Sequence, residues 1–383
     1  MKRRDLICHI TTVHNAFDTR ILYKECASLA REFEEVLLIA PAEMDSEFSR
    51  VKIVKIPQFK NRLLRILGGN AIAFLKAKEI NAKIYHFHDP EFVIWALFLK
   101  LLTRSKVIYD VHEDYYTSIP EKKWLKGRLW KRAFASLFSF LEKRVSSFFD
   151  AVVLAEEYYA DSFAGTNKRI VKILNYPLST ESHEEINFKK NAFSVVYCGT
   201  VSETRGLWNI LGTVLALARR TSRFKVYIIG KFSSESLLKQ AEKFIRENNL
   251  HAFIDIVGGD KYVRREVMDL YLKSMDLGLF LPPVSKHYER KLPTKFFEYM
   301  LAGIPFVVTD FPEWHKFVQE NGCGIAVQPN DFFNIANMIE YYMEHPSERK
   351  RMGINGRENA LKKYSWRSEE EKLLRLYREL LDL

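Results

Sequence analysis

Two rhythms of apolar and polar positions alternate along the chain. In residues 20–33 apolar side chains recur every three or four positions, as on one face of a helix, whereas residues 51–57 alternate one by one, as in a half-buried strand. The regular succession of such segments is typical of a parallel β-sheet covered by helices on both faces. In the first half we predict strands over 5–11, 35–41, 51–57, 82–89, 105–114 and 150–156.

The rhythm breaks at the polar segment Tyr176–Lys190, which contains Pro and Ser and is predicted to be an interdomain linker. A second alternation follows, and residues 366–383 form an amphipathic terminal helix. Because 383 residues exceed what one hydrophobic core usually supports, we predict an α/β fold with two Rossmann-like doubly wound domains, residues 1–178 and 179–365, facing each other across a cleft. Strands of the second domain are expected over 193–200, 225–230, 253–259, 277–283 and 324–329, and one more at the end of the segment 291–310.

Composition adds an expectation about partners and location. Hydrophobic residues make up 47% and charged residues 28%, as in soluble globular proteins, while the net charge of +11 points to an acidic partner. The four cysteines lie far apart without a CxxC pair, so neither a disulfide framework nor a zinc knuckle is indicated. No apolar run has the length of a signal-peptide core or a membrane span. We therefore expect a cytoplasmic protein.

Candidate chemistry lies in the strand-to-helix turns, because ligands of doubly wound folds bind at the carboxyl ends of the strands. The first turn, residues 11–20, contains no Gly, so the dinucleotide-binding fingerprint is absent. His14, Asp18 and Arg20 are its candidates for contact with a ligand. The alternative is that Asp18 caps the following helix and Arg20 is solvated.

The segments YHFHDPE and YDVHED bring histidines and carboxylates to two further strand ends. His86 and His88 share one face of their strand, and with Asp89 they could bind a metal. We expect no metal, because a fourth ligand at a recognisable spacing is missing; Asp89 and Pro90 can simply begin a helix. His112, beside Glu113, is a candidate hydrogen-bond donor or base, since its charge can be tuned near neutral pH.

Two segments of the second half fit a nucleoside diphosphate. In YCGTVSETRGL a strand ends at Gly199, and Arg205 precedes a helix whose N-terminus can bind phosphate; a solvated Arg is the alternative. In KLPTKFFEYMLAGIPFVVTD, Lys295 and Glu298 lie one turn apart near a helix start. Lys295 suits phosphate and Glu298 suits the two hydroxyls of a ribose. The alternative is a surface ion pair, which the apolar neighbours of Glu298 disfavour.

These two segments resemble the donor half of a retaining GT-B glycosyltransferase of family 4. The segments HNAFDTRILYKECASLA, YHFHDPE, YDVHEDYY and ILNYPL resemble the acceptor half of its bacterial polysaccharide-assembly branch, and YSWRSEEEKLLRLY resembles the helix that crosses back to the first domain. The resemblance implies metal-independent transfer of a sugar with retention of configuration, with no cofactor and with the nucleotide sugar as a substrate. It also implies a glycan or lipid-linked acceptor, with a UDP-sugar favoured over a GDP-sugar as donor.

Matched to the family's motifs, Glu298 is the second Glu of E-x7-E, whereas the position of the first Glu is Arg290, with Glu289 one residue out of register. Thr200 stands where the family usually has an Arg, and Lys295 is expected to replace that charge. The resemblance implies His112, Arg205 and Lys295 as catalytic residues. It implies donor contacts at Gly199, Thr200, Arg205, Val257, Gly258, Arg290, Leu292, Lys295 and Glu298. The expected acceptor-side residues are His14, Asp18, Arg20, His88, Asp89 and Glu113.

Basic, aromatic-bearing segments at 121–144 and 59–67 account for part of the positive charge. Such segments bind anionic bilayers, so we expect peripheral attachment to the inner face of the plasma membrane; the alternative is a solvated face over an ordinary core helix. Nucleic acid is not expected, because no reader module is recognisable. Three other functions remain open from the sequence: a UDP-sugar 2-epimerase of the same fold, a non-catalytic nucleotide-sugar-binding subunit, and a metallohydrolase built on His86, His88 and Asp89.

Overall fold

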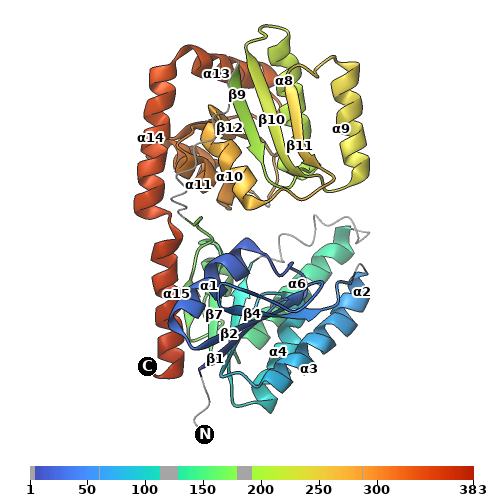
Figure 1. Cartoon of the computed structure of the whole chain (residues 1–383), viewed down its shortest axis with the longest axis vertical. Coiled ribbons are helices and arrows are strands. Elements are labelled where there is room, and N and C mark those ends of the chain that lie inside the picture. Colours follow the sequence, from blue (N-terminus) through green and yellow to red (C-terminus); the bar gives the residue numbers. More distant parts are fainter. Residues whose placement is uncertain (1–4, 60, 113–127, 179–191, 287) are drawn as a thin grey trace. The chain divides into compact units, whose positions relative to one another are not determined.

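The computed structural model describes residues 5–59, 61–112, 128–178, 192–286 and 288–383. The chain divides into two compact units, residues 1–178 together with 366–383 and residues 179–365 (Figure 1). Among the described residues, no helix combines the length and the apolar character needed to cross a membrane.

The first unit is built on an eight-stranded sheet of order β3-β4-β2-β1-β5-β6-β7-β8, in which only β3 runs antiparallel to its neighbour. This confirms the parallel arrangement predicted from the alternating pattern and adds two short edge strands, β3 and β8, whose three residues give too little pattern to recognise. The strands are β1 Leu6–Ile10, β2 Glu35–Pro41, β3 Ser46–Phe48, β4 Val51–Ile56, β5 Ile84–Phe87, β6 Lys106–Val111, β7 Ala151–Leu154 and β8 Ile170–Lys172.

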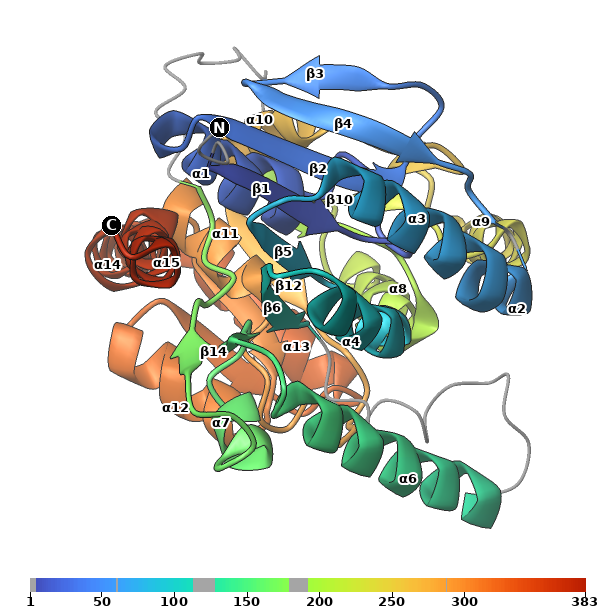
Figure 2. The ribbon, with the colours of Figure 1, turned by 90° about the horizontal axis from the view of Figure 1, so that it is seen from below.

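Helices cover both faces of this sheet, because β1 and its neighbours are apolar on both faces. Ile7 of β1 packs with η1, α1 and α15 on one face, whereas Cys8 and Ile10 pack with α3 and α4 on the other. Figure 2 shows α3, α4 and α6 following one another along that second face. The helical segments are η1 Thr19–Cys26, α1 Ala27–Glu32, α2 Arg62–Leu64, η2 Arg65–Gly69, α3 Asn70–Ile80, η3 Pro90–Phe92, α4 Val93–Leu102, α6 Arg128–Ser146, α7 Tyr159–Phe163 and α15 Trp366–Leu381.

The second unit has a six-stranded, fully parallel sheet of order β11-β10-β9-β12-β13-β14. Its strands are β9 Phe193–Cys198, β10 Phe224–Lys231, β11 Ile254–Gly259, β12 Leu277–Phe280, β13 Phe306–Thr309 and β14 Gly324–Val327. All six were predicted. Its helical segments are η5 Glu203–Arg205, α8 Leu207–Ala218, α9 Glu235–Glu247, α10 Arg265–Ser274, α11 Thr294–Ala302, α12 Pro312–Asn321, α13 Phe332–Glu344 and α14 Pro346–Lys363.

Each sheet reverses its strand order once, between β1 and β5 in the first unit and between β9 and β12 in the second. At such a switch point the connections leave the sheet in opposite directions and open a crevice at the carboxyl ends of the two strands, where ligands of doubly wound folds bind. The residues that follow β1, β5, β9 and β12 are therefore the candidates for ligand binding.

The terminal helix α15 belongs to the first unit although it ends the chain. Its apolar face enters the core beside η1 and α1, where Trp366 and Tyr377 are fully buried (Figure 1). The indole Nε1 of Trp366 donates a hydrogen bond to Ser28 Oγ at 3.0 Å. The first 178 residues thus obtain part of their core from the last 18 residues of the sequence, 366–383.

Candidate active site

Lys295 is a largely buried lysine of the second unit whose ammonium lies near two aromatic rings. It lies in the first turn of α11, its side chain is only 7% exposed, and its Nζ lies 5.4 Å from the ring centre of Tyr197 and 5.5 Å from that of Phe280. Burial, and then the positive charge of Arg205, lower the pKa of Lys295 to about 8. An ammonium held between aromatic rings without a full counter-charge is poised to bind an anion.

Gly199, directly after β9, makes room for this ammonium. A Cβ atom at Gly199 would lie 2.5 Å from Lys295 Nζ, and its φ of +123° is one that residues with side chains rarely adopt. Arg205 follows in η5, half-buried, and is close enough for its charge to act on Lys295. Thr200 is exposed, and its carbonyl accepts a hydrogen bond from Tyr197 Oη at 2.6 Å. The structure therefore brings Gly199, Arg205 and Lys295 together at the β9–β12 switch point.

Glu298, one turn after Lys295, pairs with a residue that the sequence reasoning missed. Arg265, the first residue of α10, donates a short hydrogen bond to Glu298 Oε1, and its Nε lies 2.9 Å from Asp269 Oδ1. The charge of Glu298 raises the pKa of Arg265, although burial opposes this. The i, i+4 spacing of Arg265 and Asp269 is visible in the sequence, but their contact with α11 is not. The pair with Arg265 replaces the surface Lys–Glu pair considered from the sequence alone.

The remaining expected donor contacts lie at the end of one strand and in one loop. Val257 and Gly258 are half-buried at the carboxyl end of β11. Arg290 is exposed in the loop before α11, and Leu292 is half-buried there. This loop is anchored by Trp314, whose Nε1 donates to the Lys291 carbonyl at 2.7 Å.

In the first unit, a buried guanidinium organises the strand ends. Arg20 of η1 is 4% exposed and donates two hydrogen bonds of 2.9 Å to the carboxylate of Asp110, in β6, and a third of 2.9 Å to the Ile173 carbonyl. The idea that Arg20 is solvated is therefore wrong. Although burial alone would raise it, the charges of Arg20 and His112 hold the pKa of Asp110 well below its usual range.

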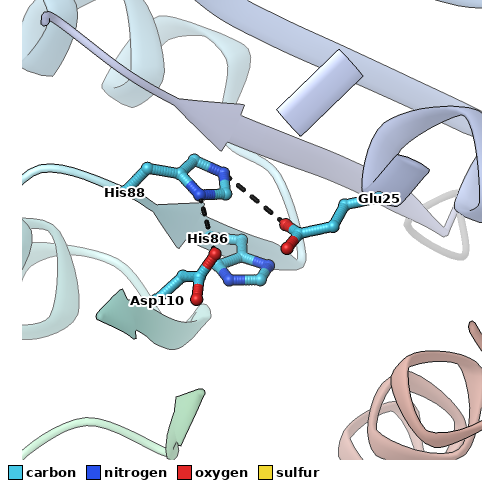
Figure 3. Close-up of side chains that lie close together, drawn as sticks. All are labelled: Glu25, His86, His88 and Asp110. Carbon is cyan, nitrogen blue, oxygen red and sulfur yellow. Dashed lines mark hydrogen bonds and ion pairs between the residues drawn. The ribbon is translucent and has the colours of Figure 1, made fainter. Parts of the chain in front are cut away.

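Three buried histidines surround this pair on neighbouring strands. His9 comes from β1, His86 from β5 and His88 from the end of β5, and the rings of His86 and His88 stack at 4.8 Å, as expected from their shared face. Burial lowers the pKa of all three, that of His88 to about 4. They are therefore neutral at physiological pH, and Figure 3 shows His86 and His88 beside Glu25 and Asp110.

His112, the residue after β6, is more exposed than His9, His86 and His88, with 13% of its side chain exposed. Its Nε2 lies 2.6 Å from Asp110 Oδ2, and its ring centre lies 5.3 Å from that of His14. His14 is half-exposed in the turn after β1 and lies 3.5 Å from Asp18. Glu113 lies outside the described residues. Among the described residues expected on the acceptor side, His14 and Asp18 are partly exposed, and the ring of His112, which was expected to be catalytic, lies beside that of His14.

Asp18 and Asp89 have local structural partners. Asp18 caps η1, accepting from the backbone N–H of Arg20 and of Ile21, which bears out the capping alternative. Asp89 is buried before η3, and its Oδ2 accepts from Thr11 Oγ1 and from the backbone N–H of Thr12. Asp89 thereby fixes the turn that carries His14.

The cluster of Glu25, His86, His88 and Asp110 offers four ligand atoms within 4.8 Å of one another. A divalent ion would nevertheless compete with the guanidinium of Arg20, whose Nε lies 3.0 Å from Glu25 Oε1 and 2.9 Å from Asp110 Oδ2. Burial and the charge of Asp110 also raise the pKa of Glu25 well above its usual value, so this carboxyl is neutral. The arrangement fits a fixed cation with one counter-charge better than a metal centre.

Comparison with known proteins decides the class of the second unit. Residues 179–359 match the family model described as glycosyl transferases group 1. The match spans almost the whole of the second unit. The match confirms the expected enzyme class. No curated protein sequence matches the chain.

Solved structures extend the likeness to the whole chain. A sucrose-phosphate synthase from Thermosynechococcus elongatus is 16% identical, with a TM-score of 0.75 over 99% of this chain and 100% of that one. Alr3699/HepE of Anabaena, in complex with UDP-glucose, is 13% identical with a TM-score of 0.72 over 98% and 99%. A glycosyltransferase from Rickettsia africae is 14% identical, with 0.69 over 99% of both chains. At these identities the likeness establishes the GT-B fold, as predicted.

Proposed function

We propose that this glycosyltransferase belongs to retaining family 4 and transfers a sugar from a UDP-sugar to a glycan or lipid-linked acceptor in surface polysaccharide biosynthesis, without a metal or other cofactor. The observation that carries the proposal is the position of the Lys295 ammonium over Gly199, with Arg205 beside it, at the β9–β12 switch point. The UDP-glucose held by the Anabaena relative supports the choice of donor.

In this proposal Lys295 and Arg205 bind the diphosphate. Cleavage of the bond between sugar and phosphate places negative charge on the leaving oxygen, and two cations in a water-poor site stabilise that charge. The departing phosphate then accepts the proton of the acceptor hydroxyl. The side chains of the second unit bind and neutralise charge in this scheme, and none of them forms a bond to the sugar.

Glu298 binds the ribose in this proposal with the carboxylate that Arg265 positions. A carboxylate has several lone pairs, so it can accept hydrogen bonds from more than one donor. Arg265 then acts as a positioning residue that holds the carboxylate in one rotamer, as supporting contacts do in preorganised sites.

The test replaces Lys295 with Met, which keeps the buried stem and removes the charge. Because a hydrogen bond to a charged group contributes about 1.5–3 kcal/mol, UDP affinity should fall about 10- to 100-fold. Calorimetry with UDP measures this, and Lys316→Met, at an exposed position of α12, is the matched control. Transfer assays with UDP- and GDP-sugars identify the donor. Unchanged UDP binding by the Lys295 variant would overturn the proposal.

We also propose that the acceptor is met at an anionic inner-membrane surface, and the support lies in the first unit. Along α6 the small or polar residues Ala135, Ser139 and Ser146 are buried, whereas most of the large apolar side chains are exposed. The helices α4 and α3, which follow α6 in Figure 2, carry further exposed apolar side chains. The outer face consists of the exposed side chains Leu75, Ile94, Phe98, Leu101, Leu102, Trp130, Phe134, Leu137, Phe140 and Leu141.

Basic side chains are also exposed on the helices that carry this outer face. Lys78, Arg104, Arg132 and Arg144 are exposed on the same helices or directly after them. An ordinary soluble surface would not collect so many large apolar side chains, and basic residues interleaved with aromatic ones suit the interface of an anionic bilayer. Of the basic segment expected at 121–144, residues 121–127 lie outside the described residues.

Vesicle co-sedimentation tests the membrane proposal independently of catalysis. Vesicles containing phosphatidylglycerol should bind the protein, and replacing Trp130, Phe134 and Leu137 together with Ser should reduce binding more than tenfold, because apolar burial contributes about 25 cal/mol per Å². Ile354 and Leu361, exposed on α14, provide the matched control when changed to Ser. Equal binding of the triple variant and the wild type would refute the role of this face.

A further inference from the structure

A continuous chain of hydrogen bonds connects the terminal helix to His112 through the interior of the first unit. Tyr377 Oη, in α15, lies 3.0 Å from His9 Nε2, and His9 Nδ1 lies 3.0 Å from His88 Nε2. His88 Nδ1 lies 3.2 Å from Asp110 Oδ2, the oxygen that His112 Nε2 also contacts at 2.6 Å. Tyr377, His9, His88 and Asp110 are each at most 1% exposed.

The direction of every bond in this chain follows from Asp110. Its carboxylate accepts two hydrogen bonds from Arg20 and can only accept from the two imidazoles as well. Both His88 Nδ1 and His112 Nε2 must therefore carry hydrogens, and their separation of 3.2 Å fits two donors converging on one oxygen.

The positions of the other hydrogens in the chain follow from these two. Because a neutral imidazole carries one hydrogen, His88 Nε2 is an acceptor and His9 Nδ1 must donate to it. His9 Nε2 is then an acceptor for the hydroxyl of Tyr377. The oxygen of Tyr377 accepts in turn from His86 Nδ1, at 2.8 Å. The chain ends at His86 Nε2, a buried atom with no hydrogen-bond partner among the described residues.

We propose that Asp110, held by Arg20, positions the His112 ring with its hydrogen on Nε2 and leaves Nδ1 as the nitrogen available to a ligand, and that the same carboxylate sets the one-way chain of His88, His9 and Tyr377 behind it. Neutral, buried polar groups cost free energy unless all are satisfied, so such a chain specifies one arrangement of rings and hydrogens. The terminal helix thereby shares one hydrogen-bond chain with His112, although Tyr377 is 265 positions from His112 in the sequence.

Ring-nitrogen NMR with 15N-labelled histidine tests the proton arrangement directly, without reference to any activity. We expect His9, His86 and His88 to carry the hydrogen on Nδ1 and His112 to carry it on Nε2. Asp110→Asn, which replaces the accepting carboxylate with an amide, should convert His112 to a mixture of tautomers, whereas Tyr377→Phe should shift the ring signals of His9 and His86 and leave the hydrogen of His112 on Nε2. Tyr342→Phe, which removes an equally buried hydroxyl in the second unit, is the matched control. His112 with its hydrogen on Nδ1 in the wild type would overturn the proposal, as would unchanged histidine signals in Tyr377→Phe.

A second pair of variants keeps the test decisive if Asp110→Asn does not fold. His9→Asn retains a donor near the position of Nδ1 and should preserve the ring signals of His88, whereas His9→Leu removes the donor and should shift them. Loss of the His112 hydrogen from Nε2 in either variant would contradict the control by Asp110.

The kinetic consequence rests on the proposed function. If His112 contacts the transferred sugar, Asp110→Asn should lower kcat about tenfold, the equivalent of one hydrogen bond to a charged group, with little change in the KM for the donor. If the tautomer of His112 changes in the variant but the wild-type protein transfers no sugar, the proposed function is refuted and the positioning of His112 is not. Unaltered kcat together with altered tautomers would show that the chain does not serve catalysis.

Discussion

At the scale of single residues, Lys295 carries a testable pH dependence. Burial beside Arg205 lowers its pKa to about 8, so the free protein loses this positive charge as the pH rises through that value. A bound diphosphate favours the charged form, which means that binding above pH 8 requires uptake of a proton. UDP affinity should therefore fall as the pH rises above 8, by up to about tenfold per pH unit.

Calorimetry between pH 7 and pH 9 measures this dependence. Lys295→Met serves as the reference, because it retains every other titrating group of the protein and of UDP. The wild-type advantage over the variant should shrink across this range. A constant advantage would mean that Lys295 stays charged throughout and that its burial has less effect than the structure indicates.

At the scale of elements, α15 and α6 are amphipathic helices of the first unit whose tryptophans have opposite environments. Trp366 of α15 is 2% exposed and bonded to Ser28, whereas Trp130 of α6 is 78% exposed. Trp366→Ala should therefore lower the free energy of unfolding by about 3–5 kcal/mol, the usual cost of truncating a buried aromatic residue. Trp130→Ala should leave unfolding unchanged and weaken vesicle binding.

Denaturant titration and vesicle co-sedimentation of the same two variants check this contrast. Loss of stability in Trp130→Ala would indicate that its side chain is covered within the protein, and the membrane role of the outer face would then fail. The comparison also explains why helix periodicity alone was ambiguous here: both helices have an apolar stripe, and the sequence does not say whether a stripe faces the core or the surroundings.

At the scale of the whole molecule, the regular α/β order was predictable because each strand and helix has its own local pattern. The grouping of Gly199, Arg205 and Lys295 was predictable because all three lie in the segments that follow β9 and β12, the two strands at one switch point. Contacts between distant segments were not: Arg265 reaches Glu298 across 33 positions, and Tyr377 reaches His9 across 368. Nothing in the local pattern of α10 or α15 indicates those partners, because tertiary packing selects them.

Separate cores in the two units predict that UDP stabilises only one of them. The proposed contacts of UDP all lie in residues 179–365, so at 100 times its Kd it should add about 2.7 kcal/mol to that unit. For a unit of this size, the corresponding rise in Tm is about 5–10 °C. Hydrogen exchange during heating should show slower opening of β9, β12 and α11 with UDP, and unchanged opening of β1, β5 and α15. Equal protection of both units by UDP would place the nucleotide in contact with both, contrary to a site built by Gly199, Arg205 and Lys295 alone.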